Sequence, residues 1–168
     1  IDTSAVLFGK RLAAPIVIAA MTGGTAAAVA INRDLATVAE ARGYGFGLGS
    51  QRPMLTAPDD PSYLVRDVAP RCLLLGNLAA VQAREHGVER VAELARRIGA
   101  DAMCLHLDPA MEIVQPGGDR DFRGVLATLA AARKELPVPV IAKETGAGIG
   151  PRTARRLAEA GIAHVDVS

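Results

Sequence analysis

The stretch PIVIAAMTGGTAAAVAINRDLATVAEARG, residues 15–43, decides the fold class of this chain. Its first seven residues are apolar and of strand length, and a TGGT turn follows them. Residues 26–43 are predicted to form a helix that ends at Gly43, since glycine commonly terminates helices. One buried strand, one glycine turn and one helix make a βα unit. Chains built from such units form parallel sheets covered by helices.

The same alternation continues along the rest of the sequence. The predicted strands cover residues 15–21, 44–50, 72–78, 101–107, 138–144 and 162–168, and the predicted helices cover residues 26–43, 82–99, 123–136 and 150–161. Pro151 is expected to be the first helical residue of the last helix. The two long connections are predicted as loops: residues 51–70, with a helical turn at residues 63–68, and the segment 106–122, whose first two residues end the fourth predicted strand.

Six strands in such an order imply a parallel sheet with right-handed crossovers. A β/α barrel and an open doubly wound sheet are both compatible with this pattern. Polar residues follow the strands, and contributions from six strands to one place favour the barrel, because an open sheet binds mainly at its switch point. We therefore expect residues 1–168 to form one incomplete domain with about six of the eight units of a TIM-type (β/α)8 barrel. An eight-unit barrel needs about 250 residues, so a piece of a longer chain is expected.

Composition excludes several classes of partner. The 19 basic and 18 acidic side chains leave a net charge of +1, which gives no electrostatic case for binding nucleic acid or an anionic membrane surface. No apolar run approaches the roughly 20 residues that span a bilayer. Cys72 and Cys104 each lie in an apolar run and are expected to be buried free thiols, which fits a reducing cytoplasm.

Two glycine-rich segments are candidates for binding. Glycines in MTGGT, residues 21–25, let the backbone approach a flat ring or a phosphate, although the motif alone favours a tight turn into the next helix. In GLGSQR, residues 47–52, Ser50 and Arg52 could bind a phosphate, and the alternative is an exposed loop arginine.

Further along the chain, single polar residues end apolar runs. Asn77 offers an amide that can bind a heterocycle edge, or it simply forms a turn. Lys143 either forms an ion pair with Glu144 or Asp166, or stabilises negative charge on a bound cofactor.

The segment HLDPAMEIVQPGGDRDF, residues 106–122, carries the acidic candidates. Its Asp108 and Glu112 suit Mg²⁺, which prefers one or two carboxylates together with phosphate and water. Zinc is a poor match because His106 has no second His or Cys at ligand spacing, and His106 could merely be hydrogen-bonded. The chain has neither a P-loop nor a GxSxG motif, so we expect catalysis to depend on a cofactor.

The order of the motifs is more specific than any one of them. From IDTSAVLFGKRLAAPIVIAAMTGGT through INRDLA, GLGSQR, LLGNLAAVQ, HLDPAMEIVQPGGDRDFRG and AKETGAGI to AGIAHVDVS, the chain resembles the type 2 isopentenyl diphosphate isomerases, which are FMN-dependent (β/α)8 barrels. These enzymes move the double bond of isopentenyl diphosphate to give dimethylallyl diphosphate, and reduced flavin is thought to serve as acid and base. The resemblance also implies Mg²⁺, NADPH for flavin reduction, a small-molecule diphosphate substrate and a homotetramer or larger assembly.

The resemblance assigns roles to individual residues. It implies that FMN is bound by Met21, Thr22, Gly23, Ser50, Asn77, Lys143 and Ser168. It implies that the substrate is bound by Ser50, Arg52, His106, Asp108 and Met111. Lys143 and His106 are the implied catalytic residues, and Glu112 is the implied Mg²⁺ ligand.

Two residues depart from the family pattern. Asp108 stands where the family usually has Asn, and Met111 stands where it has a Gln that is proposed to shuttle a proton. A thioether cannot do so. A related FMN-dependent barrel oxidoreductase with another substrate, and a non-catalytic barrel fragment, therefore remain alternatives.

Overall fold

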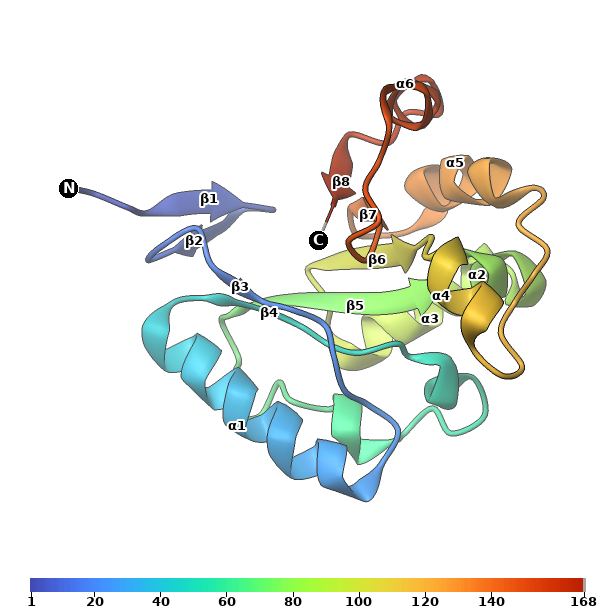
Figure 1. Ribbon diagram of the computed structural model, residues 1–168. Coiled ribbons are helices and arrows are strands. Elements are labelled where there is room, and N and C mark those ends of the chain that lie inside the picture. The colour runs from blue at the N-terminus through green and yellow to red at the C-terminus, as the bar shows by residue number, and fades with distance from the viewer. Residues whose placement is uncertain (168) are drawn as a thin grey trace. The chain divides into compact units, whose positions relative to one another are not determined.

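The computed structural model describes residues 1–167 as an α/β fold built from two compact units. The first unit comprises Ile1–Asn77 and Glu93–Met103, and the second comprises Leu78–Ala92 and the residues from Cys104 onward. The six strands of the main sheet follow one another in chain order, β3-β4-β5-β6-β7-β8 (Figure 1). A doubly wound sheet reverses its strand order at a switch point, so the consecutive order argues against that alternative.

The first unit contains the N-terminal half of the parallel sheet. Its elements are β1 (Ala5–Leu7), β2 (Lys10–Leu12), β3 (Val17–Ile18), α1 (Ala26–Arg42), β4 (Gly45–Gly47), the 3-10 helices η1 (Arg52–Leu55) and η2 (Pro61–Tyr63), and parts of β5 (Leu73–Ala79), α3 (Val88–Ile98) and β6 (Ala102–His106). Helix α1 packs against β4 and η2, as Figure 1 shows. β4 pairs in parallel with β3 on one side and with β5 on the other.

Both ends of α1 are set by single residues. The Thr25 side chain accepts a hydrogen bond from the Ala28 amide at 3.2 Å and caps the first turn. Gly43 adopts the left-handed conformation with φ 67°, and its own amide donates to the Ala39 carbonyl oxygen. The predicted helix over residues 26–43 is confirmed to within one residue.

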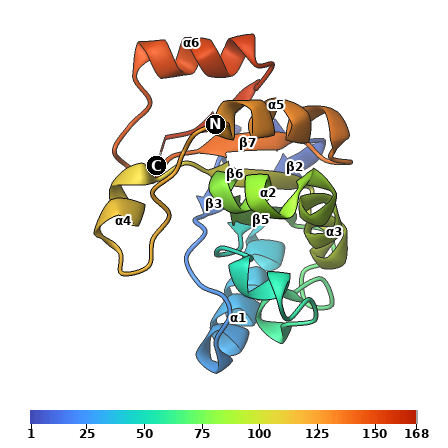
Figure 2. The ribbon, with the colours of Figure 1, turned by 90° about the vertical axis from the view of Figure 1, so that its right-hand side faces the viewer.

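The second unit contains the C-terminal half of the sheet with its helices. Its elements are α2 (Ala80–His86), the ends of β5 and β6, the start of α3, α4 (Pro109–Val114), α5 (Val125–Glu135), β7 (Val140–Lys143), α6 (Pro151–Glu159) and β8 (His164–Asp166). Helices α2 and α5 pack side by side (Figure 2). β7 and β8 are parallel, and Lys143 stands opposite Asp166 in their register.

All six predicted strands are present, but three connections differ from expectation. The helix predicted over residues 82–99 is two helices, α2 and α3, because Gly87 at φ 86° breaks it. The loop predicted over residues 106–122 contains helix α4, which begins at Pro109. Residues 66–68 form a turn where the helical turn was predicted at residues 63–68, with the Ala69 amide donating to the Val65 carbonyl oxygen at 3.0 Å. The prediction lacked the two 3-10 helices before this turn, η1 and η2.

The hairpin of β1 and β2 was also missed by sequence reasoning. Its two turn residues, Phe8 at φ 49° and Gly9 at φ 76°, both have positive φ, as the tight turns of two-residue hairpins require. Phenylalanine rarely adopts positive φ, so the sequence around Phe8 did not indicate a hairpin turn. Within residues 1–167, no helix combines the length and apolarity that crossing a bilayer demands.

Candidate functional site

In the first unit, a buried asparagine holds the glycine loop that follows β3. Asn32 is 1% exposed, and its side-chain nitrogen donates to the carbonyl oxygens of Thr22 at 3.1 Å and Ser62 at 2.7 Å. The Thr22 hydroxyl donates to the Asn32 side-chain oxygen at 2.6 Å. Sequence reasoning assigned no role to Asn32. The available signal was a polar residue among the alanines on the buried face of α1.

Tyr63 supports the same loop from the other side. A side chain on Gly23 would overlap the Tyr63 phenol ring, so the loop passes over the ring only because residue 23 is glycine. The Tyr63 hydroxyl donates to the Ser50 carbonyl oxygen at 2.5 Å. Burial, followed by the nearby Asp60 charge, raises the pKa of Tyr63, which keeps the hydroxyl protonated as a donor.

The ends of β4 and β5 are joined through Gln51. The Gln51 amide donates to the Asn77 carbonyl oxygen at 2.7 Å, and the Gln51 side-chain oxygen accepts from the Asn77 amide at 3.1 Å. Asn77 lies inside β5, two residues before its end, whereas the prediction placed it at the strand's end. Arg52 starts η1 and is exposed, and Met21 is 80% exposed.

The first unit therefore holds six of the predicted site residues: Met21, Thr22, Gly23, Ser50, Arg52 and Asn77. They lie in or directly after β3, β4 and β5, in line with the expectation that functional residues follow parallel strands. Their predicted contacts with flavin and diphosphate stay predictions.

In the second unit, three predicted residues form one cluster. His106 ends β6, Asp108 precedes α4, and Glu112 lies within α4. One candidate ligand atom from each residue lies within 4.8 Å of the others. The His106 Nε2 is 3.6 Å from an Asp108 carboxylate oxygen, and the two side chains are 11% and 16% exposed. Helix α4 thus turns a carboxylate inward, since Glu112 is 8% exposed.

Burial governs the protonation of this cluster. Burial, and then the Lys143 charge, lowers the pKa of His106 to about 4. Burial, followed by repulsion from the Glu112 and Glu144 carboxylates, raises the pKa of Asp108 to about 6. At neutral pH, His106 is therefore a neutral imidazole, which is the state in which it can ligate a metal.

Lys143 completes the polar end of β7. It is 8% exposed, and its ammonium lies 2.8 Å from the Asp166 carboxylate and donates to the Glu144 carbonyl oxygen at 3.1 Å. The ion pair proposed from the sequence is therefore present, with Asp166 as the partner. The expected role of Lys143 beside a cofactor is compatible with this pair and stays a prediction.

Glu144 organises the loop after β7. One of its carboxylate oxygens accepts hydrogen bonds from four successive backbone amides, those of residues 145–148, at 2.6–3.1 Å. Burial alone would raise the pKa of Glu144, but these four donors outweigh it and lower the pKa. Sequence reasoning treated Glu144 only as a partner for Lys143 and did not anticipate this role.

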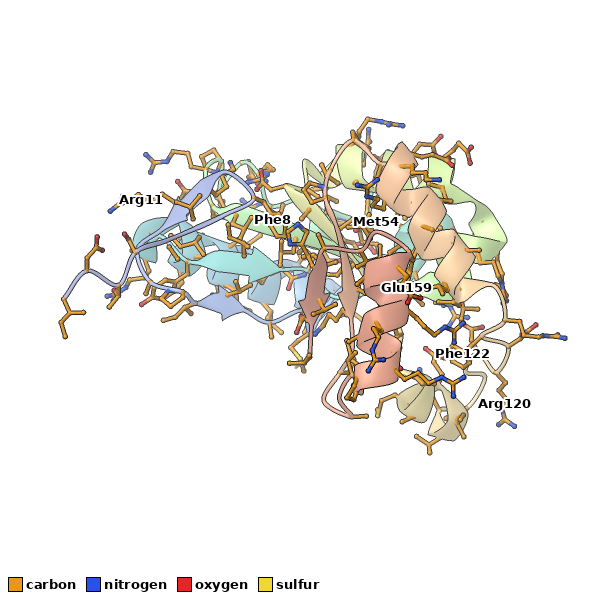
Figure 3. All side chains as sticks on the ribbon, turned by 90° about the horizontal axis from the view of Figure 1, so that it is seen from above. Phe8, Arg11, Met54, Arg120, Phe122 and Glu159 are labelled. Atoms are coloured by element: carbon orange, nitrogen blue, oxygen red, sulfur yellow. The ribbon has the colours of Figure 1, made fainter. Side chains whose placement is uncertain are left out.

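Met111 and Ser168 are the remaining predicted site residues. Met111 is 55% exposed on α4. The connection from α4 to α5 carries Arg120 and Phe122, and Arg120 projects outward (Figure 3). Ser168, the predicted neighbour of the FMN phosphate, lies outside the described residues.

The curated proteins that this chain is similar to share one name. No family model matches the chain. Curated proteins named isopentenyl-diphosphate delta-isomerase are 46% identical in Stutzerimonas stutzeri, covering 100% of this chain and 49% of that protein, and 45% identical in Thermococcus onnurineus, covering 99% and 47%. The relative in Pyrococcus furiosus is 44% identical, covering 100% and 45%. The predicted resemblance is confirmed, and the chain spans about half the length of these relatives.

Solved structures share the fold at much lower identity. A mandelate oxidase variant with the monooxide FMN adduct has a TM-score of 0.69 at 18% identity, covering 98% of this chain and 50% of that one. A second structure of the same mandelate oxidase variant, with the C4a-OH-FMN adduct, has a TM-score of 0.59 at 16% identity, covering 98% and 51%. At these identities the likeness concerns the fold.

Proposed function

We propose that the protein to which these residues belong is an FMN- and Mg²⁺-dependent isopentenyl-diphosphate delta-isomerase of the type 2 class, which converts isopentenyl diphosphate to dimethylallyl diphosphate. The observation that carries the proposal is identity of 43–46% along 99–100% of the chain to curated proteins with that name. The consecutive parallel strands support a closed (β/α)8 barrel, to which this chain contributes about six units.

The residues of the first unit fit a flavin. Met21 leaves an apolar side chain 80% exposed beside the glycine loop, where it can cover a ring face. Thr22, Ser50 and Asn77 offer hydroxyl and amide groups for the polar edge of the ring. In the second unit Lys143 offers a buried cation, which suits the electron-rich edge of a reduced flavin. Ser168 would lie near the phosphate.

The substrate is held through its charge in this proposal. Arg52 can bind a diphosphate with two hydrogen bonds, and Ser50 and His106 add further polar contacts. Glu112 would hold Mg²⁺, whose charge would help to neutralise the diphosphate, and the burial of Glu112 in α4 fits a ligand fixed in one orientation. Asp108 and Met111 lie on the same segment, on either side of the start of α4.

The reaction itself is a proton addition and a proton removal. A reduced flavin, when bound, would supply this acid/base chemistry after reduction by NADPH. The role of Lys143 is to hold negative charge at the ring edge, and its pairing with Asp166 fixes the ammonium in place. Met111 has no acidic proton, so it takes no part in proton transfer. We further propose a cytoplasmic homo-oligomer of four or more subunits.

An anaerobic assay of the full-length protein with reduced FMN, Mg²⁺ and isopentenyl diphosphate tests the proposal. We expect dimethylallyl diphosphate without net consumption of NADPH, and loss of product in Lys143→Ala and Glu112→Ala. Lys134→Ala and Glu135→Ala, exposed residues at the end of α5, are the matched controls. Full activity in Lys143→Ala and Glu112→Ala would reject these site assignments.

A second candidate function follows from the shared fold. The structural neighbours are mandelate oxidases, so an FMN-dependent oxidoreductase on the same scaffold is the alternative. Stoichiometric consumption of a reductant or an oxidant during turnover would favour it over the isomerase.

A further inference from the structure

We infer that His106, Asp108 and Glu112 form a three-ligand metal site that binds a transition-metal dication such as Mn²⁺ more tightly than Mg²⁺. The inference rests on the proposed function for the presence of a metal beside the substrate diphosphate. It goes further because it adds His106 and Asp108 as metal ligands and expects the site to prefer Mn²⁺ over Mg²⁺.

The cluster has the geometry of a metal-binding set. The three candidate ligand atoms lie within 4.8 Å of one another, with one imidazole nitrogen and one oxygen from each carboxylate. The side chains of His106 and Asp108 are 11% and 16% exposed, and Glu112 is 8% exposed. A small inward movement of each group would place all three around one ion.

The local backbone directs both carboxylates to this point. Asp108 occupies the N-cap position of α4, yet its side chain makes no capping hydrogen bond to the helix. Glu112 follows four residues later, which places both residues on the same side of the first turn. The Asp119 amide donates to the Glu112 carboxylate at 2.7 Å and fixes its orientation, as hydrogen bonds to metal ligands commonly do.

Two further observations support a built site. A side chain on Gly118 would collide with the Glu112 backbone carbonyl, so the chain folds tightly around this glutamate only because residue 118 is glycine. Gln82 is 4% exposed, and its side-chain nitrogen donates to an Asp119 carboxylate oxygen at 3.2 Å. Within the described residues the Gln82 side-chain oxygen is buried without a hydrogen-bond partner, and a water bound to a metal is a donor that suits it.

The ligand types set the preferred ion. Mg²⁺ takes oxygen ligands and binds through one or two carboxylates, whereas imidazole suits transition metals. One imidazole nitrogen beside two carboxylates therefore favours a transition-metal dication such as Mn²⁺, which takes carboxylate oxygens as Mg²⁺ does and accepts a nitrogen ligand more readily. Asp108, which departs from the Asn that the family resemblance implies, supplies the additional negative charge. A carboxylate at residue 108 would repel a diphosphate unless a cation compensates its charge, and a bound dication provides that compensation.

Metal binding by the full-length protein, freed of metal with a chelator and without flavin or substrate, tests this site. Free Mn²⁺ is followed by electron paramagnetic resonance during titration, and Mg²⁺ is added as competitor. We expect displacement only at about tenfold or larger excess of Mg²⁺, and an affinity for Mn²⁺ lower by about tenfold or more in Asp108→Asn. Asp121→Asn, a matched change in the same connection that lies outside the cluster, is expected to bind as the wild type does.

Coordination by histidine has its own spectroscopic signature. Electron spin echo modulation from a ¹⁴N nucleus is expected in the wild type with bound Mn²⁺ and absent in His106→Gln. The wild-type spectrum and the competition with Mg²⁺ need no variant, so they decide the matter even if a substitution prevents folding. Equal affinity for the two ions, unchanged binding by Asp108→Asn, or no nitrogen signal would overturn the inference. None of these results alters the isomerase assay, and a failed assay leaves the binding result standing.

Discussion

The Tyr63 hydroxyl donates a hydrogen bond to the Ser50 carbonyl oxygen at 2.5 Å, while the Tyr63 ring fills the space behind Gly23. One buried side chain from η2 thereby contacts two segments that are predicted to bind flavin, the glycine loop after β3 and the end of β4. Tyr63 is a positioning residue in this view, because it acts on the backbone of the predicted binding residues.

Tyr63→Phe removes this hydrogen bond and keeps the ring. We expect a loss of about 1 kcal/mol in the free energy of unfolding, the usual effect of one hydrogen bond. We also expect severalfold weaker binding of FMN, measured by flavin fluorescence, because the Ser50 backbone loses the hydrogen bond that fixes its position. Tyr44→Phe, on a half-buried tyrosine before β4, is the control. Unchanged FMN affinity in Tyr63→Phe would show that the hydroxyl serves stability alone.

Gly23→Ala places a methyl group where the Tyr63 phenol lies. Overpacking of this kind typically costs about 1–3 kcal/mol, and chemical denaturation of the variant measures it. Gly150→Ala is the control, since a side chain there meets open space. The double variant Gly23→Ala with Tyr63→Ala should lose the clash, so strict additivity of the two substitutions would contradict this packing argument.

Glu144 makes stability depend on pH in a defined direction. The folded-state pKa of Glu144 is lowered, so the unfolded state binds more protons at acidic pH. The contribution of Glu144 to the free energy of unfolding is therefore complete above the ordinary glutamate pKa of 4.5. It is lost as the pH falls through the folded-state value. We expect the denaturation midpoint of the wild type to fall more steeply below pH 5 than that of Glu144→Gln. Glu135→Gln, on an exposed residue, should follow the wild type.

The limits of sequence reasoning can be seen in particular residues. The end of α1 at Gly43 and the start of α6 at Pro151 were predictable because both rest on local backbone preferences. Helix α4 was not, because its inward residue is Glu112 while Met111, Ile113 and Val114 are exposed, the reverse of an ordinary amphipathic pattern.

The residues that hold the candidate site in place could not be found from the sequence, for a different reason. Asn32, Tyr63 and Glu144 act by hydrogen bonds to backbone atoms of distant or irregular segments, and a periodic pattern carries no record of such partners. The residues that end strands could be found from the sequence, because parallel strands gather their carboxyl ends at one edge. Which residues hold them in place required the tertiary structure.

Met111→Gln introduces the amide that the family resemblance implies at this position. Because Met111 is 55% exposed, we expect the free energy of unfolding to change by no more than about 0.5 kcal/mol. An amide can donate and accept hydrogen bonds, whereas a thioether sulfur has no proton to donate and accepts only weakly, so we expect a severalfold higher rate of isomerisation in the anaerobic assay. Met111→Leu removes the sulfur without adding an amide and should leave the rate unchanged. A rate in Met111→Gln equal to that of Met111→Leu would show that proton transfer proceeds without help from residue 111.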